Sequence, residues 1–281
     1  MGKLIWIASY PKSGNTWVRI FLNTILINPE EPLSINEISR LTISDSMPVF
    51  YEKLAGKPIW EFDIDEVTRY RAKVHRAMTR LHPNPVLVKT HSILGEHNGI
   101  PLLTPEVTGA AVYLVRNPLD IVASYANHRS LDIDAVIERI GRENWVLGKL
   151  QKEKPSVPSY VSSWSTNVRS WTEKDQSKVL ILRYEDLLER PLEGFGRLVR
   201  FFNLQRSEEE IERAVRFTTI DEFRKQEAEE GFHERRDAGG RFFRSGKAGG
   251  WREELTADQA ERIVARHREQ MQRFGYVPEG M

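Results

Sequence analysis

The residues best suited to chemistry are nine consecutive ones, SYPKSGNTW at positions 9–17, which directly follow an apolar run. The pattern predicts a buried strand, a short turn carrying Lys12, and a helix whose first turn holds hydroxyl and amide groups. N–H groups at a helix start point outward, and the helix dipole adds about half a positive charge there. With the charge of Lys12, this arrangement suits an anion. The alternative is an ordinary strand–turn–helix junction with a surface lysine. The string is not the GxxxxGK[ST] phosphate loop, because its lysine precedes the glycine.

A second pair, Lys89 and His91, stands at the end of the apolar run Val86–Thr90. Ligands bind at the carboxyl ends of strands in open parallel sheets, which is where this run would deliver both side chains. A neutral imidazole there can take a proton from an attacking hydroxyl. The alternative is a structural histidine. We favour a general base.

A third group follows the run Val112–Val115. Arg116 ends the predicted strand, and Ser124 lies in the helix that begins near Pro118. The planar fork of an arginine suits phosphate, and a serine hydroxyl can complete the contact. We interpret Asp120 as an acidic complement to the helix dipole.

A fourth segment is basic and rich in glycine. From Arg235 to Arg252 there are six basic residues, one acid and five glycines. Such a segment can fold over a phosphate, with glycine N–H groups as donors. The alternative is a disordered basic loop, and we expect mobility there in the absence of nucleotide.

These strings, in this order, resemble the motifs of the PAPS-dependent sulfotransferases, where PAPS is 3′-phosphoadenosine 5′-phosphosulfate. The first string resembles the phosphosulfate loop, and the second resembles a K-T-H motif. The resemblance implies three catalytic residues: His91 as the base, Lys89 near the sulfuryl group, and Lys12 at the leaving phosphate. It also implies a set of PAPS-binding residues, which are Lys12, Ser13, Gly14, Asn15, Thr16, Trp17, Arg116, Ser124, Tyr184, Thr218, Arg244, Ser245 and Gly246.

The resemblance also carries departures. The family pattern R-K-G-x-x-G-D-W has its lysine replaced by Ser245, which removes one charge from the 3′-phosphate site, and its aspartate by Gly250. Thr218 matches the family, but Ile220 stands at the aromatic position that follows, so a weaker apolar contact replaces stacking on adenine. Tyr184 matches a Y-E-D-L segment. Its neighbours Arg183 and Glu185 have an alternative role as a structural ion pair.

These residues require elements that position them. Near-continuous apolar runs predict buried strands, and apolar residues at helical spacing predict helices. The predicted strands are Leu4–Ser9, Val86–Thr90, Ala110–Val115 and Val179–Arg183. The predicted helices are Trp17–Ile27, Pro118–Asn127, Tyr160–Lys174, Glu193–Asn203, Glu208–Phe217 and Thr256–Phe274. Alternation of the two predicts an α/β fold with a central parallel sheet flanked by helices on both faces. The resemblance implies the P-loop-like sulfotransferase fold as a single domain over residues 1–281.

Two stretches, residues 28–84 and 128–159, interrupt this alternation. We expect them to form lids over the acceptor site, with plain surface elaboration as the alternative. Aromatic residues in the first stretch fit an acceptor wall or ordinary packing equally well; they are Phe50, Tyr51, Trp60 and Phe62.

The composition narrows the function further. The 281 residues include 41 basic and 40 acidic ones, so no overall field recruits nucleic acid or a membrane surface. The absence of cysteine excludes disulfides, cysteine-ligated metals and thiol nucleophiles. No apolar run approaches the length of a membrane span or of a signal segment. We therefore expect a cytoplasmic chain.

The function implied by the resemblance is sulfuryl transfer from PAPS to a hydroxyl, which leaves PAP as product. The acceptor is a small molecule, a glycan or a natural-product scaffold, and its identity stays open. The opening string and Asn167–Thr172 look more like bacterial small-molecule sulfotransferases than Golgi enzymes. No divalent metal is expected, because lysine and backbone donors replace it. The rival interpretations are a P-loop-like kinase using ATP and a catalytically silent nucleotide-binding protein.

The expected oligomeric state follows from one segment. Residues 253–261 correspond to the segment that pairs subunits in related cytosolic enzymes, but Glu253 replaces its lysine and Ala257 its valine. Each change acts twice across a two-fold axis. We expect a monomer, or a dimer through another surface.

Overall fold

The computed structural model describes residues 2–173, 177–235, 240–244 and 246–281. The chain forms two compact units. Unit 1 comprises Met1–Tyr10, Leu41–Tyr113 and Arg142–Ile181, and unit 2 comprises Pro11–Arg40, Leu114–Gly141 and Leu182–Met281. Among the described residues, no helix combines the length and apolar character that a membrane crossing requires.

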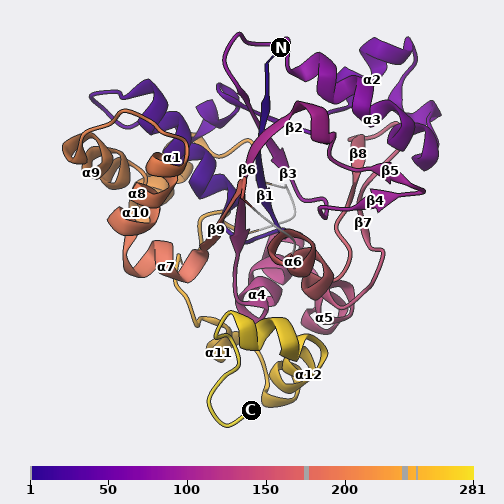
Figure 1. The fold of residues 1–281 in the computed structure, drawn as a ribbon. Helices are drawn as coiled ribbons and strands as arrows, with labels where there is room; N and C mark the ends of the chain where they lie inside the picture. The colour runs from indigo at the N-terminus through magenta and orange to yellow at the C-terminus, as the bar shows by residue number, and fades with distance from the viewer. Residues whose placement is uncertain (1, 174–176, 236–239, 245) are drawn as a thin grey trace. The chain divides into compact units, whose positions relative to one another are not determined.

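A five-stranded sheet in the order β2-β3-β1-β6-β9 belongs mainly to unit 1, and its strands are labelled in Figure 1. The strands are β1 (Leu4–Ser9), β2 (Thr42–Ser44), β3 (Val86–Thr90), β6 (Thr108–Val115) and β9 (Val179–Arg183). Strand β3 pairs in parallel with both β1 and β2, and Ala8 lies opposite Thr90. The predicted α/β fold with a central parallel sheet is confirmed.

Shorter elements complete unit 1. Two antiparallel pairs are formed by β4 (Glu96–His97) with β5 (Ile100–Pro101), and by β7 (Val146–Lys149) with β8 (Ser156–Tyr160). The helices are α2 (Pro48–Ala55), α3 (Ile64–Met78) and α6 (Trp164–Thr172), with 3₁₀ turns η2 (Ile59–Glu61) and η3 (Pro105–Val107). Helix α2 packs against α3, and α3 against β8.

The predicted helix over 160–174 is shorter than expected. Its first residue, Tyr160, ends β8, and the Ser163 side chain caps α6 by accepting a hydrogen bond from the Thr166 N–H at 3.1 Å. Lys174 lies outside the described residues. Trp164 and Trp171 are fully buried, as their spacing predicted. The strand boundaries were predicted more accurately than this helix. Three of the four predicted strands have the observed bounds, and β6 starts two residues before its predicted start, at Thr108.

Unit 2 is helical. Its helices are α1 (Asn15–Ile27), α4 (Pro118–Arg129), α5 (Ile133–Ile140), α7 (Tyr184–Glu189), α8 (Pro191–Phe201), α9 (Glu208–Phe217), α10 (Ile220–Glu230), α11 (Trp251–Glu254) and α12 (Ala257–Arg273), with the 3₁₀ helix η1 (Ile35–Ser39). Helix α1 packs on α9 and η1, while α12 packs on α4 and α5. Capping boxes at Ser207 and Thr256 fix the starts of α9 and α12.

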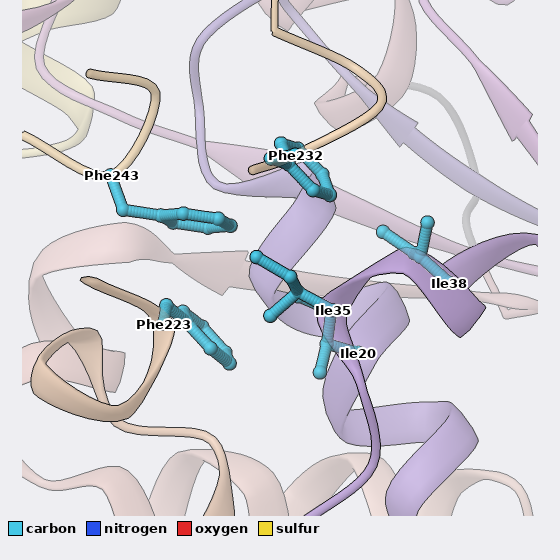
Figure 2. Packing of buried hydrophobic residues seen from close by; sticks show 6 residues of the cluster. All are labelled: Ile20, Ile35, Ile38, Phe223, Phe232 and Phe243. Carbon is cyan, nitrogen blue, oxygen red and sulfur yellow. The ribbon is translucent and has the colours of Figure 1, made fainter. Parts of the chain in front are cut away.

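An aromatic core joins distant parts of unit 2 (Figure 2). Ile20 of α1 and Ile35 and Ile38 of η1 face three phenylalanines from α10 and the segment after it, which are Phe223, Phe232 and Phe243. Through Phe243, this core holds the basic glycine-rich segment against Ile20 of helix α1.

Candidate active site

The start of helix α1 has the features of an anion site. Lys12 and Gly14 both adopt positive φ, 70° and 97°, which turns the chain sharply into the helix. Within the described residues, no side chain caps α1, so its first N–H groups are left for another acceptor. The Ser13 hydroxyl is buried and makes no hydrogen bond to any residue that the structure describes. An orphaned buried hydroxyl beside uncapped N–H groups fits a phosphate or sulfate oxygen.

Gly14 is required by close packing. A Cβ atom built there would lie 2.7 Å from Cδ2 of Tyr184, far inside van der Waals contact. The Tyr184 ring also carries the Arg116 guanidinium, whose carbon lies 4.3 Å from the ring centroid. Burial raises the pKa of the Tyr184 phenol, so the ring stays neutral. Gly14, Tyr184 and Arg116 therefore form one packed stack.

Arg116 connects this stack to the anion loop. It is buried, and its Nη1 donates to the backbone oxygen of Lys12 at 2.9 Å. Its Nε is buried without a hydrogen-bond partner among the described residues, which leaves one donor for a ligand. Ser124 lies on α4, which begins just after Arg116, and is partly exposed. The structure thus brings together Lys12, Gly14, Arg116 and Tyr184 of the predicted set.

Two predicted phosphate ligands already hold internal carboxylates. Arg244 makes a two-pronged ion pair with Glu254, at 2.8 Å and 2.5 Å. The Thr16 hydroxyl donates to Glu234 at 3.4 Å, and the same carboxylate receives Arg19 at 2.8 Å. Lys12 lies over the ring of Phe242, 4.3 Å from its centroid. Glu254 and Glu234 thus accept hydrogen bonds from side chains that the sequence assigned to phosphate, and these contacts could not be predicted from the sequence.

The remaining predicted nucleotide residues are placed as follows. Thr218 is buried at the end of α9, where its hydroxyl donates to the Ala214 carbonyl at 2.8 Å. Gly246 has a φ of 60°, and a Cβ there would lie 2.6 Å from the Ile220 side chain, so these two positions are packed together. Asn15 is buried and Trp17 packs against the core of Figure 2. Ser245 lies outside the described residues.

Arg183 and Glu185, which the sequence offered as a structural ion pair, each have a different partner in the structure. Arg183 pairs with Asp186 at 2.8 Å. Glu185 accepts hydrogen bonds from the Asn117 N–H at 3.0 Å and from the Tyr276 hydroxyl at 2.7 Å. Both contacts hold the loops next to Arg116 and Tyr184, so these acids are structural.

In unit 1, His91 is held in one tautomer. Its Nδ1 lies 2.8 Å from the Ser9 carbonyl oxygen, which can only accept, so Nδ1 carries the proton. In the neutral ring, Nε2 then has the lone pair that a general base needs. The His91 carbonyl accepts from the Asn167 amide at 3.1 Å, and the Tyr113 hydroxyl orients that amide at 2.8 Å.

Buried charges support the strand that leads to His91. Asp45 is buried and accepts from the Thr90 hydroxyl at 2.8 Å, while its N–H donates to the Lys89 carbonyl at 3.1 Å. Burial raises the pKa of the Asp45 carboxyl, and the charges of Arg71 and Lys89 oppose that rise. The Thr90 hydroxyl also accepts from the Ser92 N–H at 3.1 Å, so it spans His91. Sequence reasoning missed Asp45, because its role depends on the β2–β3 register.

Two of the four aromatic residues singled out in the first insertion belong to the core. Tyr51 and Phe62 are buried, Phe50 is half-buried and Trp60 is 38% exposed. Packing therefore accounts for Tyr51 and Phe62.

Among the described residues, no three His, Cys, Asp or Glu side chains are grouped as a metal site.

Comparison with known proteins bears on the whole chain. The family model for the sulfotransferase domain matches residues 3–275. Sulfotransferase 1B1 of Canis lupus familiaris is 24% identical over 95% of this chain and 83% of its own length. Cytosolic sulfotransferase 13 of Arabidopsis thaliana is 25% identical over 92% of this chain and 74% of its own.

Solved structures share the fold. A retinol dehydratase in complex with androsterone and PAP has a TM-score of 0.65 at 18% identity, covering 99% of this chain and 83% of that one. A mouse sulfotransferase complexed with PAP has a TM-score of 0.59 at 17% identity, covering 96% and 84%. Since the family model covers almost the whole sequence, the chain belongs to the PAPS-dependent sulfotransferase family.

Proposed function

We propose that this enzyme transfers the sulfuryl group of PAPS to a hydroxyl of a small-molecule, glycan or natural-product acceptor, with His91 as the general base. The observation that carries the proposal is the tautomer of His91: the Ser9 carbonyl fixes the proton on Nδ1 and so leaves Nε2 basic. Family membership supplies the sulfuryl donor, and the residues above give the groups that act on it.

The proposed step balances as follows. The acceptor oxygen forms a bond to sulfur while the bond from sulfur to the 5′-phosphate oxygen breaks. His91 Nε2 takes the acceptor proton, and PAP leaves with the bonding electron pair. By analogy with phosphoryl transfer, we expect a loose transition state with charge growing on the leaving oxygen. Lys12 and the uncapped N–H groups of α1 stabilise that charge, and Lys89 is assigned to the sulfuryl group.

The nucleotide is assigned to groups in unit 2. The orphaned Ser13 hydroxyl, the Gly14 turn and the α1 N-terminus suit the 5′-phosphosulfate. Arg116, with one unused buried donor, suits the 3′-phosphate together with Ser124, Arg244 and Gly246. Two of the similar structures hold PAP with androsterone or retinol, which supports a PAP-binding role and a small-molecule acceptor for this chain as well.

The insertions at residues 28–84 and 128–159 stay our proposed acceptor lids within one sulfotransferase domain. Of the four aromatic residues singled out in the first insertion, the exposed Trp60 and the half-buried Phe50 are proposed to contact an acceptor, because Tyr51 and Phe62 are buried in the core.

The test is transfer of label from ³⁵S-PAPS to a panel of phenols, alcohols, glycans and natural-product scaffolds. We expect acceptor-dependent transfer with release of PAP, lost in Lys12→Ala and retained in Lys225→Ala, which removes an exposed lysine of α10. Thermal stabilisation by PAP, compared with Mg·ATP, separates this enzyme from a kinase. Stabilisation by Mg·ATP alone, with no label transferred, would overturn the proposal.

A further inference from the structure

Two buried carboxylates hold the glycine loop, defined here as residues 242–244 and 246–251, at its two ends. At the start, Glu227 of α10 accepts from the N–H groups of Phe242 at 2.7 Å and Phe243 at 3.0 Å. At the end, Asp120 of α4 accepts from the N–H groups of Gly249 at 2.9 Å and Trp251 at 3.0 Å. Asp120 is 4% and Glu227 5% exposed.

These hydrogen bonds differ from those of exposed side chains, because both carboxylates are buried. A buried carboxylate is costly unless its oxygens are hydrogen-bonded, and each oxygen of Asp120 receives one backbone N–H. Bonds to an ionised acceptor are shorter and about twice as strong as neutral ones. Two of them on one carboxylate fix both the position and the orientation of the loop end. A helix-dipole complement would need neither burial nor these donors.

The two ends differ in what else secures them. The start of the loop is also anchored by Phe243, which lies in the aromatic core of Figure 2. Arg224 of α10 adds a hydrogen bond to the Arg244 carbonyl at 3.0 Å. At the other end, Gly249 adopts a φ of 80°, and the buried Trp251 begins α11, which packs on α4. Asp120 supplies the directional contacts at that end.

From this arrangement we infer that Asp120 is a positioning residue for 3′-phosphate recognition. It ties the end of the glycine loop to α4, the helix that begins just after Arg116 and carries Ser124. One carboxylate thus sets the spacing between two groups of donors, Arg116 with Ser124 and Arg244 with Gly246. The inference rests on the proposed function, because it needs the 3′-phosphate to bind there.

The test compares two ligands that differ by the 3′-phosphate, 3′,5′-ADP and 5′-AMP, by titration calorimetry. In Asp120→Asn one oxygen is replaced by an amide that cannot accept, so one loop bond is lost. We expect affinity for 3′,5′-ADP to fall about tenfold or more while affinity for 5′-AMP stays the same. With saturating PAPS, kcat should hold, so the loss appears in KM.

The matched control is Asp258→Asn. Asp258 also lies in the first turn of its helix, α12, but is 79% exposed and its partner is Arg262. That variant should keep the preference for 3′,5′-ADP. A folded Asp120→Asn protein with an unchanged preference would overturn the inference. If the wild type itself fails to prefer 3′,5′-ADP over 5′-AMP, the proposed 3′-phosphate site is wrong instead.

A measurement on the wild type covers the case in which Asp120→Asn does not fold. Amide hydrogen exchange should show the N–H groups of Gly249 and Trp251 protected without ligand, since Asp120 holds both. Adding 3′,5′-ADP, but not 5′-AMP, should extend protection to the Gly246 N–H. Free exchange at Gly249 and Trp251 in the apo enzyme would contradict the role given to Asp120.

Discussion

Replacing Gly14 by alanine tests the packing of the nucleotide loop against Tyr184. The change has two separable effects. Alanine is strained at a φ of 97°, at roughly 1–2 kcal/mol. Its Cβ would also lie 2.7 Å from the Tyr184 ring, and overpacking of that kind costs about 1–3 kcal/mol. We therefore expect Gly14→Ala to lower the free energy of unfolding by about 2–5 kcal/mol.

A second glycine isolates the steric part. Gly275 has a φ of 68° and open space around its Cβ position, and it lies in the same unit as Gly14. Gly275→Ala should lose only the strain contribution, so the difference between the two variants in urea unfolding measures the clash. Replacing Tyr184 by leucine in the Gly14→Ala background should recover part of that difference as a coupling of about 1–3 kcal/mol.

Ligand binding gives the functional readout. A displaced Tyr184 ring no longer supports the Arg116 guanidinium 4.3 Å from its centroid. Loss of a cation–π contact of about 1–2 kcal/mol predicts roughly 5- to 30-fold weaker PAP binding in Gly14→Ala. Equal losses of stability in Gly14→Ala and Gly275→Ala, with PAP affinity intact, would refute the stacking of Gly14, Tyr184 and Arg116.

Two further predictions concern charge. Arg116→Ala should weaken 3′,5′-ADP binding by about 2–4 kcal/mol, and unchanged affinity would mean that the 3′-phosphate binds elsewhere. Lys12→Ala should mainly lower kcat, because the Lys12 charge matters most as the leaving group develops charge. Burial, with help from the Arg71 charge, lowers the pKa of His75 to about 3. The unfolded chain then binds a proton below about pH 6.5 that the folded chain does not, so stability is full above that pH and falls on acidification, by about 2 kcal/mol at pH 5. His75→Phe should remove that part of the slope between pH 8 and pH 5 in urea unfolding, and an unaltered slope would show that His75 titrates normally.

Secondary structure could be predicted from the sequence wherever the local pattern of apolar residues matches their burial in the fold. The bounds of β1, β3 and β9 match the predicted ones, because each strand is a short run of mainly apolar residues followed by polar ones. The start of α6 was misplaced because Tyr160 and Val161 continue the apolar spacing of the helix. They lie before the cap at Ser163, and Tyr160 pairs with Val146 of β7. Pairing between strands is not encoded in local periodicity.

The sequence suggests candidate site residues where a residue's type and its position in the chain point to the same chemistry. His91 and Arg116 directly follow strands β3 and β6, and Lys12 lies in the loop between β1 and α1. Contacts between distant residues were not readable. Asp45 meets Thr90 only through the β2–β3 register, and Glu254 meets Arg244 across the glycine loop. Because an acidic residue is common in the first turn of a helix, the hydrogen bonds from Gly249 and Trp251 to Asp120 could not be expected from the sequence.

The role of His91 is tested most directly by His91→Ala, assayed for sulfuryl transfer from labelled PAPS and for binding of 3′,5′-ADP. Loss of a general base should lower kcat by about 10²–10⁴. Binding of 3′,5′-ADP should stay as in the wild type, because the base acts on the acceptor. A His91→Ala enzyme that keeps more than about half of the wild-type kcat would contradict the assignment of the base.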